Sequence, residues 1–593
     1  MKNLRVLLKY FIKYKWHLLF GTIFVFLANY FRVLQPQMIR EALDAVLQNI
    51  NQYNTAATPE IKKSIFDSVS HSVMKFSLIV LGLALLMGVF MYLMRQTIIV
   101  MSRLIEYDLH KEMFHHYQSL STSFFKRNNT GDLMARITED VSRVRMAIGP
   151  AILYGINLVS TFTLVIFSML QVSPKLTFYC LLPLPFLSFI IYYVSNLINK
   201  KSEIIQQNLA ILNSTAQETY SGIRVVKSFA QEQQVSDLFE KQANNYRAKS
   251  LELIRVESYF FPSMALLIGL STVLTVYVGG LEVIKGNITP GNIAEFVIYV
   301  NMLTWPVTAI GWIASLVQRA SASQKRINDF MQEKPDVTNP IVDPKSFDGN
   351  IVFENVSFTY PVTNITALKN ISFNIKPGER IAIVGKTGCG KSTIADLLLR
   401  IYDVTEGKIL IDGNEITSLD LFNLRRQIGY VPQDGFLFSD SVANNISYGS
   451  IASQEKIRDF AQSVAIHGEI MALPEEYETT VGERGVTLSG GQKQRISIAR
   501  ALIKDPDIII LDDCLSAVDA GTEQKILEYL NENITQKTTI VITHRITTLL
   551  SYDKIFVMKD GAIVEQGDHE ELIMLNGLYK EMFERQNIEI NNL

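Results

Sequence analysis

The sequence predicts a multi-domain membrane protein, in which an all-α domain of six spanning helices with long cytoplasmic helical extensions precedes an α/β domain. Three observations predict this class. Six apolar stretches in the first half of the chain are each long enough to cross a bilayer. From Asn350 onward the pattern changes to short strands alternating with helices. Between a strand pattern and a helix pattern, residues 385–392 read Gly-Lys-Thr-Gly-Cys-Gly-Lys-Ser, a phosphate-loop sequence.

The composition agrees with a protein that lies partly in lipid. The chain has 593 residues, more than one hydrophobic core organises, and 48% of them are hydrophobic while 19% are charged. The net charge of −2 gives no reason to expect a nucleic-acid partner. The 3 cysteines lie far apart without C-x-x-C spacing, which indicates neither a disulfide framework nor a zinc site.

Residues 1–15 are basic on an amphipathic helical pattern and run directly into an apolar span. A signal peptide would have a short apolar region followed by a cleavage site of small residues, and this pattern is missing. We therefore expect an interfacial helix on the cytoplasmic surface of a membrane.

The transmembrane domain is predicted to occupy residues 16–330. Buried helices of a large soluble protein are the alternative, but they would carry polar stripes at helical spacing, and the apolar residues 77–88 carry none. The six predicted spans are residues 18–34, 73–94, 148–170, 176–198, 259–283 and 293–317.

Basic residues orient these spans. The long segments 95–145 and 200–255 are rich in Lys and Arg, which places both in the cytoplasm, and an even number of spans places both termini there too. Each segment is helical in pattern but broken by turn residues, at 127–131 and at 221–222. On the outside, residues 36–72 are predicted to form the longest and most polar loop.

A linker is predicted at residues 331–349, because its three prolines are incompatible with a continuous helix. The α/β domain then covers residues 350–593. Its phosphate loop would curl backbone N–H groups around phosphate oxygens, with the positive end of a helix behind them. Lys391 would reach the β- and γ-phosphates, and the Ser392 hydroxyl would ligate Mg²⁺. The residues expected to hold nucleotide here are Gly385, Lys386, Thr387, Gly388, Cys389, Gly390, Lys391, Ser392 and Thr393.

A second buried strand, residues 507–512, ends in a carboxylate. Such a strand presents its acid, Asp512, to the Mg²⁺ that Ser392 would hold. Asp513 follows directly and is the candidate to orient or deprotonate an attacking water. Further along the chain, Ser489, Gly490 and Gly491 open a basic helix and would offer its N-terminal amides to an anion.

These motifs resemble those of ATP-binding cassette (ABC) proteins in order and approximate spacing. With the membrane part placed first, nearly the whole chain resembles the exporter half-transporters of that family, of the multidrug or lipid type. The α/β domain is accordingly expected to be a P-loop NTPase of the ABC type that uses ATP and Mg²⁺. The matching residues are Tyr360, 385–392, Gln433, 488–492, 508–512, 516–519 and His544.

The resemblance implies a dimer in which the phosphate loop of one chain and residues 488–492 of the other, including Ser489 and Gln492, enclose ATP. Tyr360 would stack on adenine, and Gln433 would sense Mg²⁺ and the membrane domain. His544 would contact the γ-phosphate, and Asp519 would lie at the dimer seam. Residues 119–125 and 219–226 would be coupling helices. The expected location is a bacterial-type cytoplasmic membrane, with the nucleotide-binding domain in the cytoplasm.

Asp513 departs from the family pattern, which usually has Glu at this position. A carboxylate one methylene shorter sits back from the water, and a misplacement of about 1 Å can lower a rate roughly 100-fold. In some members such a change marks the weak site of a heterodimer. Because His544 and residues 488–492 are intact, a slowly hydrolysing homodimer is favoured and a heterodimer remains possible.

The sequence leaves the substrate open. Export of amphipathic small molecules, drugs or lipids, is the leading function; an importer on the same architecture, a peptide exporter, and a nucleotide-gated channel or low-hydrolysis regulatory subunit are the alternatives. Polar groups in or near the spans need partners, so a cavity-facing role is the default hypothesis. For the uncharged residues, helix-to-helix hydrogen bonding has equal weight. The residues concerned are Asn29, Tyr30, Arg32, Asn157, Asn301 and Trp305.

Overall fold

The protein divides into two compact units. A computed structural model describes residues 2–340, 345–482, 485, 488–515, 518–533, 536–545 and 552–591. One unit comprises Met1–Gln118 and Gly131–Glu333, and the other comprises Ser119–Thr130 and Lys334–Leu593. The second unit therefore includes a short segment from within the predicted transmembrane domain, which a division along the sequence does not anticipate. The predicted boundaries at 15, 330 and 349 stay predictions.

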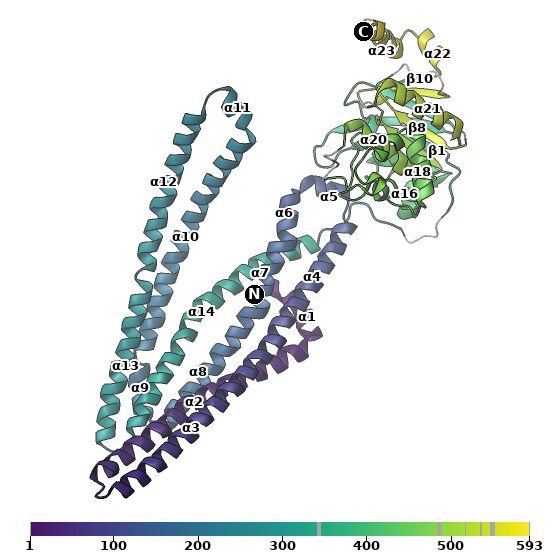
Figure 1. Ribbon diagram of the computed structural model, residues 1–593. Coiled ribbons are helices and arrows are strands. Elements are labelled where there is room, and N and C mark those ends of the chain that lie inside the picture. Colours follow the sequence, from purple (N-terminus) through teal and green to yellow (C-terminus); the bar gives the residue numbers. More distant parts are fainter. Residues whose placement is uncertain are drawn as a thin grey trace. The chain divides into compact units, whose positions relative to one another are not determined.

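Membrane-spanning helices dominate the first unit (Figure 1). Within the described residues, five continuous helical stretches are long and apolar enough to cross a bilayer: Lys15–Thr55, Pro59–Ser119, Thr130–Val172, Glu232–Ile284 and Pro290–Met331. The remaining predicted span, residues 176–198, is also helical but is divided between α9 (Pro174–Leu181) and α10 (Pro183–Ser221). For that segment, membrane crossing stays a prediction.

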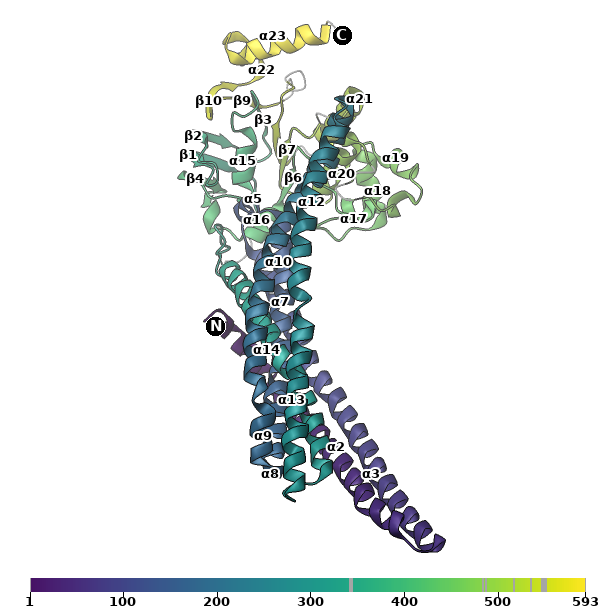
Figure 2. The ribbon, with the colours of Figure 1, turned by 90° about the vertical axis from the view of Figure 1, so that its left-hand side faces the viewer.

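The predicted outside loop at 36–72 is wrong. Helix α2 (Lys15–Thr55) continues through Pro36, and α3 (Pro59–Met94) begins with Pro59 at its first turn, so only three residues, 56–58, connect them. Proline is tolerated inside a spanning helix because neighbouring groups satisfy the backbone that it frees, so Pro36 did not mark an end. The paired helices α2 and α3 run side by side in both ribbon views (Figures 1 and 2).

Among the described residues, three π-helical turns interrupt the long helices, and one of them contains Pro150, which cannot donate a backbone hydrogen bond. Close helix packing accompanies them, since a Cβ on Gly149 would lie 2.5 Å from the Ser102 hydroxyl oxygen. The remaining helices of this unit are η1 (Lys2–Leu7), α1 (Leu8–Lys13), η2 (Arg95–Ile99), α4 (Val100–Ser119), α6 (Thr130–Ala135), η3 (Arg136–Asp140), α7 (Val141–Met146), η4 (Ala147–Ala151), α8 (Ile152–Val172), α11 (Ile223–Ser228), α12 (Glu232–Glu257), α13 (Phe260–Ile284) and α14 (Pro290–Met331).

Helices α10 and α12 form a long antiparallel pair whose tip is the short helix α11 (Figure 1). Gly222 separates α10 from α11, as its turn chemistry predicts. The pair is held by an ion pair from Lys201 to Glu252 at 3.0 Å and by a hydrogen bond from Asn245 to Asn208 at 2.7 Å. The second predicted reversal therefore exists as a separate helix at the end of this pair.

The second unit contains two sheets. An antiparallel sheet has the order β2-β1-β4-β5, and a mostly parallel sheet has the order β10-β9-β3-β8-β7-β6 (Figure 2). Its strands are β1 (Ile351–Thr359), β2 (Thr366–Ile375), β3 (Arg380–Gly385), β4 (Glu406–Ile411), β5 (Asn414–Glu415), β6 (Ile428–Val431), β7 (Ile508–Asp512), β8 (Thr538–Ile542), β9 (Lys554–Lys559) and β10 (Ala562–Gly567).

Both faces of the six-stranded sheet are buried, which explains the continuous apolar runs of its central strands. On β7, Ile508 and Ile510 pack into one cluster with β1, β2 and α15, whereas Ile509 and Leu511 pack into another with α20. The helices of this unit are α5 (Thr122–Arg127), α15 (Lys391–Leu398), η5 (Ile416–Ser418), α16 (Leu421–Gln427), α17 (Val442–Ile446), α18 (Gln454–Ser463), α19 (His467–Met471), η6 (Glu476–Glu478), α20 (Gly490–Leu502), α21 (Ala520–Asn533), α22 (His569–Met574) and α23 (Leu578–Asn591).

A buried carboxylate ties α14 to α2 in the first unit. Glu295 is completely buried and accepts hydrogen bonds from the Tyr299 hydroxyl at 3.0 Å and from the Asn292 amide at 3.2 Å. Arg40 of α2 completes the set at 3.3 Å. Arg40 is the cation that pairs with the buried charge, so the pair holds these two helices together.

Removing only the cation should destabilise the membrane unit. Arg40→Met leaves the buried Glu295 carboxylate without its cation, which typically costs about 3–5 kcal/mol. Replacing both partners, as Arg40→Met with Glu295→Leu, should recover most of that loss because no buried charge remains. Thermal unfolding of the purified protein in detergent measures both; a double variant less stable than Arg40→Met alone would contradict this explanation.

Candidate functional site

Three parallel strands end at the same level in the second unit. Ile542 of β8 lies opposite Ile383 of β3 on one side and opposite Asp512 of β7 on the other. The residues that follow these strands therefore emerge together at one edge of the sheet, where ligands bind in open α/β folds. They are the phosphate loop, Asp513 and His544.

The phosphate loop has the strand–loop–helix form that the sequence predicts. Gly390 precedes the first residue of α15 with φ 101°, and a Cβ there would lie 2.3 Å from the Ala367 carbonyl oxygen. Gly388 also has a positive φ, of 84°, but no atom lies within 4 Å of its would-be Cβ. The backbone conformation thus favours glycine at both positions, while only Gly390 is additionally confined by a neighbouring strand.

Lys391 lies inside this loop. Its ammonium group donates to the carbonyl oxygens of Gly385 at 2.8 Å and Lys386 at 3.0 Å, and Cys389 Sγ lies 3.9 Å away. Burial lowers the pKa of the Lys391 ammonium below its ordinary value. A buried cation whose hydrogen bonds go to two neutral carbonyls and a thiol can receive an anion, since a phosphate would compensate its charge better.

Ser392 and Asp512 meet across the end of β8. The Ser392 hydroxyl donates to Asp512 Oδ1 at 3.1 Å. Burial raises the pKa of the Asp512 carboxyl, and the hydrogen bond from Ser392 opposes that shift. This hydroxyl and carboxylate fit Mg²⁺, which prefers oxygen ligands and binds through one or two carboxylates together with substrate phosphates. The described residues contain no group of three or more His, Cys, Asp or Glu that could hold a metal ion.

The predicted catalytic residues gather next to this pair. Asp513 has φ 46°, a conformation that Asp tolerates, and its backbone N–H donates to the Ile542 carbonyl at 2.7 Å. The Gln433 side-chain amide donates to Asp513 Oδ2 at 3.3 Å. Burial lowers the pKa of His544, and the charge of Lys391 is the second cause of this shift. The lowered pKa favours the neutral imidazole at neutral pH.

Tyr360 lies beside the first turn of α15. Its hydroxyl is 3.0 Å from Thr393 Oγ1, and its ring packs edge-on against Phe358 and Tyr402. Lys126 of α5 places its ammonium group 5.6 Å from the centre of the Tyr360 ring and 5.3 Å from that of Tyr402. The helix that carries the first predicted coupling segment therefore contacts the predicted adenine-binding tyrosine within the second unit.

Residues 488–492, Leu-Ser-Gly-Gly-Gln, lie at the start of α20 and are separate in sequence from the phosphate loop. Ser489 caps α20 through reciprocal bonds with Gln492, at 2.8 and 3.2 Å, and Glu469 then bridges Gln492 to Arg495, each at 2.7 Å. Helix α20 packs into the cluster on the opposite face of the sheet from α15. Within the described residues, neither Ser489 nor Gln492 makes a polar contact with the phosphate loop.

Asp519 accepts a hydrogen bond from the Thr522 backbone N–H at 3.0 Å and so caps the start of α21. The preceding motif residues, Ser516 and Ala517, lie outside the described residues. Farther along α21, Glu523 is buried and pairs with Arg545, the residue that follows His544. Sequence reasoning missed this pair, although the position of a basic residue directly after His544 could have drawn attention to it.

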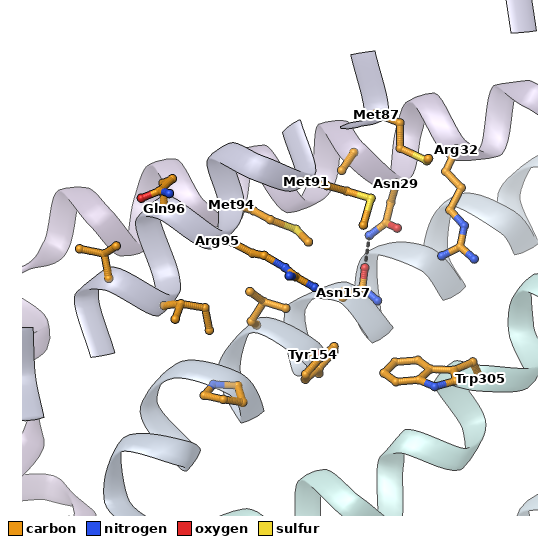
Figure 3. Close-up of a pocket in the computed structure, with 15 residues that line it drawn as sticks. Asn29, Arg32, Met87, Met91, Met94, Arg95, Gln96, Tyr154, Asn157 and Trp305 are labelled. Atoms are coloured by element: carbon orange, nitrogen blue, oxygen red, sulfur yellow. Dashed lines mark hydrogen bonds between the residues drawn. The ribbon is translucent and has the colours of Figure 1, made fainter. Parts of the chain in front are cut away.

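The first unit contains a cavity of about 580 Å³ among its helices (Figure 3). Of the polar residues singled out from the sequence, Asn29, Arg32, Asn157 and Trp305 line it. Tyr30 and Asn301 are not part of its lining, and the Asn301 amide instead donates to the Val297 carbonyl at 2.8 Å. Sequence reasoning missed Arg95, which lines the cavity from the π-helical turn after α3.

The two phosphate-loop glycines should respond differently to the same substitution. Gly390→Ala should displace the loop and abolish nucleotide binding, because its Cβ would overlap a backbone oxygen. Gly388→Ala adds only left-handed strain of about 1–2 kcal/mol, since the space around it is open. Thermal unfolding without nucleotide, followed by binding of a fluorescent ATP analogue, compares them; equal losses of stability would show that the Ala367 contact does not confine the loop.

The comparisons with known proteins cover both units. Residues 18–307 match the family model of the ABC transporter transmembrane region, and residues 368–516 match the ABC transporter model. A probable multidrug resistance ABC transporter ATP-binding/permease protein of Bacillus subtilis is 39% identical over 82% of this chain and 84% of its own length. An ATP-dependent lipid A-core flippase of Syntrophus aciditrophicus is 35% identical over 81% of this chain and 80% of its own length.

A solved structure agrees with the full-length fold. A bacterial Atm1-family ABC exporter with ATP bound superposes with a TM-score of 0.76 at 27% identity, over 98% of both chains. The transmembrane region and the ATPase domain thus occur together in one polypeptide. The chain therefore belongs to the ABC transporter family, as an integral membrane protein whose transmembrane region is fused to the ATPase domain.

Proposed function

We propose that this chain is one half of a dimeric exporter that uses ATP binding and hydrolysis to move amphipathic small molecules, drugs or lipids, across a bacterial-type cytoplasmic membrane. The observation that carries the proposal is the meeting of Lys391, the Ser392–Asp512 pair and Asp513 at one edge of the sheet. The names of the relatives, which include a multidrug transporter and a lipid A-core flippase, support the substrate range.

Each site residue has a separate role in binding or hydrolysing ATP. Lys391 exchanges its loop carbonyls for the β- and γ-phosphates, and Tyr360 stacks on adenine. Ser392, Asp512 and Gln433 would hold Mg²⁺, which neutralises charge on the phosphate oxygens. Asp513 orients the attacking water, and the neutral imidazole of His544 contacts the γ-phosphate.

The dimer follows from how one chain arranges its motifs. Ser489 and Gln492 lie on a helix that packs on the face of the sheet opposite to α15, and they satisfy each other locally. A second chain supplies the same element to the phosphate loop, together with Asp519 at the seam, so that two ATP molecules are enclosed. A homodimer is favoured because Ser489, Gln492 and His544 match the family motifs. In this proposal both termini of each chain lie in the cytoplasm.

Reconstitution tests this proposal. The purified chain in lipid should hydrolyse ATP, and Lys391→Ala should abolish hydrolysis while Lys408→Ala, an exposed lysine paired with Glu354, should retain it. Inside-out vesicles should accumulate an amphipathic dye or a labelled lipid only with ATP. Hydrolysis without accumulation of any candidate would favour an importer, whereas no hydrolysis by the chain alone would favour a heterodimer or a nucleotide-gated regulator.

Asp513 should set the turnover rate. Asp513→Glu moves the carboxylate about one methylene closer to the water and should raise the ATPase rate, by up to roughly 100-fold if the misplacement is about 1 Å. Asp513→Asn keeps the length but removes the base, and should lower the rate below that of the parent. Steady-state phosphate release at saturating ATP compares the three proteins; a Glu variant no faster than the parent would contradict this role for side-chain length.

A further inference from the structure

The cavity in the membrane unit contains two cations with no anions to pair with them. It is lined from α2, α3, η2, α4, η4, α8 and α14, and its described lining includes Arg32 and Arg95 but no Asp or Glu (Figure 3). Within the part of the chain that the structure describes, neither guanidinium group makes a hydrogen bond or an ion pair. Charged groups are costly at membrane depth unless they face a cavity and meet a partner, so these two guanidinium groups call for an anion.

Two uncharged polar groups of the cavity wall, Asn29 and Asn157, bond to each other. Asn29 donates to Asn157 Oδ1 at 2.8 Å and to Ser160 Oγ at 2.6 Å, which joins α2 to α8. For Asn29, helix-to-helix bonding is therefore the better explanation. Figure 3 places Arg32 and Arg95 on opposite sides of the Asn29–Asn157 pair. Arg32 and Arg95 are the charged contacts that the described wall of the cavity offers to a bound molecule.

The rest of the wall suits an apolar chain. Met87, Met91 and Met94 line the cavity from one face of α3, at spacings of four and three residues. Methionine side chains are flexible and polarisable and adapt to differently shaped apolar groups. Across the cavity, Tyr154 packs against Trp305, with ring centres 5.3 Å apart. At about 580 Å³ the space falls within the range of sites for small organic ligands.

We infer that this cavity selects amphipathic anions: molecules with an apolar body and a phosphate, sulfonate or carboxylate group held by Arg32 and Arg95. The inference rests on the proposed export function and narrows its substrate class. Guanidinium groups bind such oxyanions through paired, charge-assisted hydrogen bonds. Organic cations of similar apolar size are disfavoured, because they would add like charge beside two unpaired arginines.

Equilibrium binding tests the inference without relying on transport. The full-length protein is placed in nanodiscs of zwitterionic phosphatidylcholine, and ligands are titrated while tryptophan emission is recorded, since Trp305 lines the cavity. Lysophosphatidic acid and monoacylglycerol with the same acyl chain differ only in the phosphate. Lysophosphatidic acid should bind at least roughly tenfold more tightly, as a charge-assisted hydrogen bond predicts.

Matched variants assign the difference to the arginines. Arg32→Gln with Arg95→Gln should weaken lysophosphatidic acid roughly 100-fold and change monoacylglycerol by less than about twofold. Arg32→Lys with Arg95→Lys should keep much of the preference. Arg103→Gln, which removes a guanidinium on α4 outside the cavity lining, should keep all of it. A double Gln variant that retains the preference, or a parent that binds both lipids equally, would overturn the inference.

A further ligand distinguishes the sources of the anion. Taurocholate, a sulfonated organic anion, should bind with the same arginine dependence if the cavity accepts any acidic amphiphile; binding of lysophosphatidic acid alone points to a lipid headgroup. Both outcomes support the selection of anions. An arginine-dependent preference in a protein without ATPase activity would overturn the proposed function but not this inference, whereas ATPase activity without the preference would do the reverse.

Discussion

The parallel register of β3, β8 and β7 is the constraint on which the nucleotide site depends. Ile542 faces Ile383 and Asp512 at once, so the phosphate loop, Asp513 and His544 leave the sheet at one level. A slip of one residue in β7 would exchange its two faces. Ile508 and Ile510 would then leave one core cluster and Ile509 would leave the other. The apolar packing on both sides of the sheet thereby fixes the contact between Ser392 and Asp512.

Structural features that depend on residues close together in the sequence were predictable. The loop glycines, Lys391, Ser392 and Asp512 follow from strand, turn and helix signals within a few residues of each other, and the apolar spans follow from length alone. Pro36 shows where local signals fail. Proline and polar residues predict a loop in water, but inside the membrane unit the surrounding helices keep α2 helical as far as Thr55.

Pairings between distant residues could not be read from the sequence. The sequence left Asn29 with two explanations of equal weight, and the bonds to Asn157 and Ser160 decide between them. Arg95 opens the basic segment 95–145, which the sequence predicts to be cytoplasmic, and nothing local reveals that a π-helical turn brings it to the wall of a cavity. The residue roles at the ATP site stay proposals, since they depend on a second chain.

The segment Ser119–Thr130 belongs to the second unit, but the chain on both sides of it belongs to the first unit. In the second unit, the Ser121 hydroxyl accepts from the Val337 backbone N–H at 3.0 Å and Arg127 pairs with Asp336 at 3.6 Å. Lys126 adds its contact with the Tyr360 ring. The chain enters this segment from α4 and leaves it into α6. Two helices of the first unit are therefore joined covalently to this segment, and the coupling role of residues 119–125 stays a prediction.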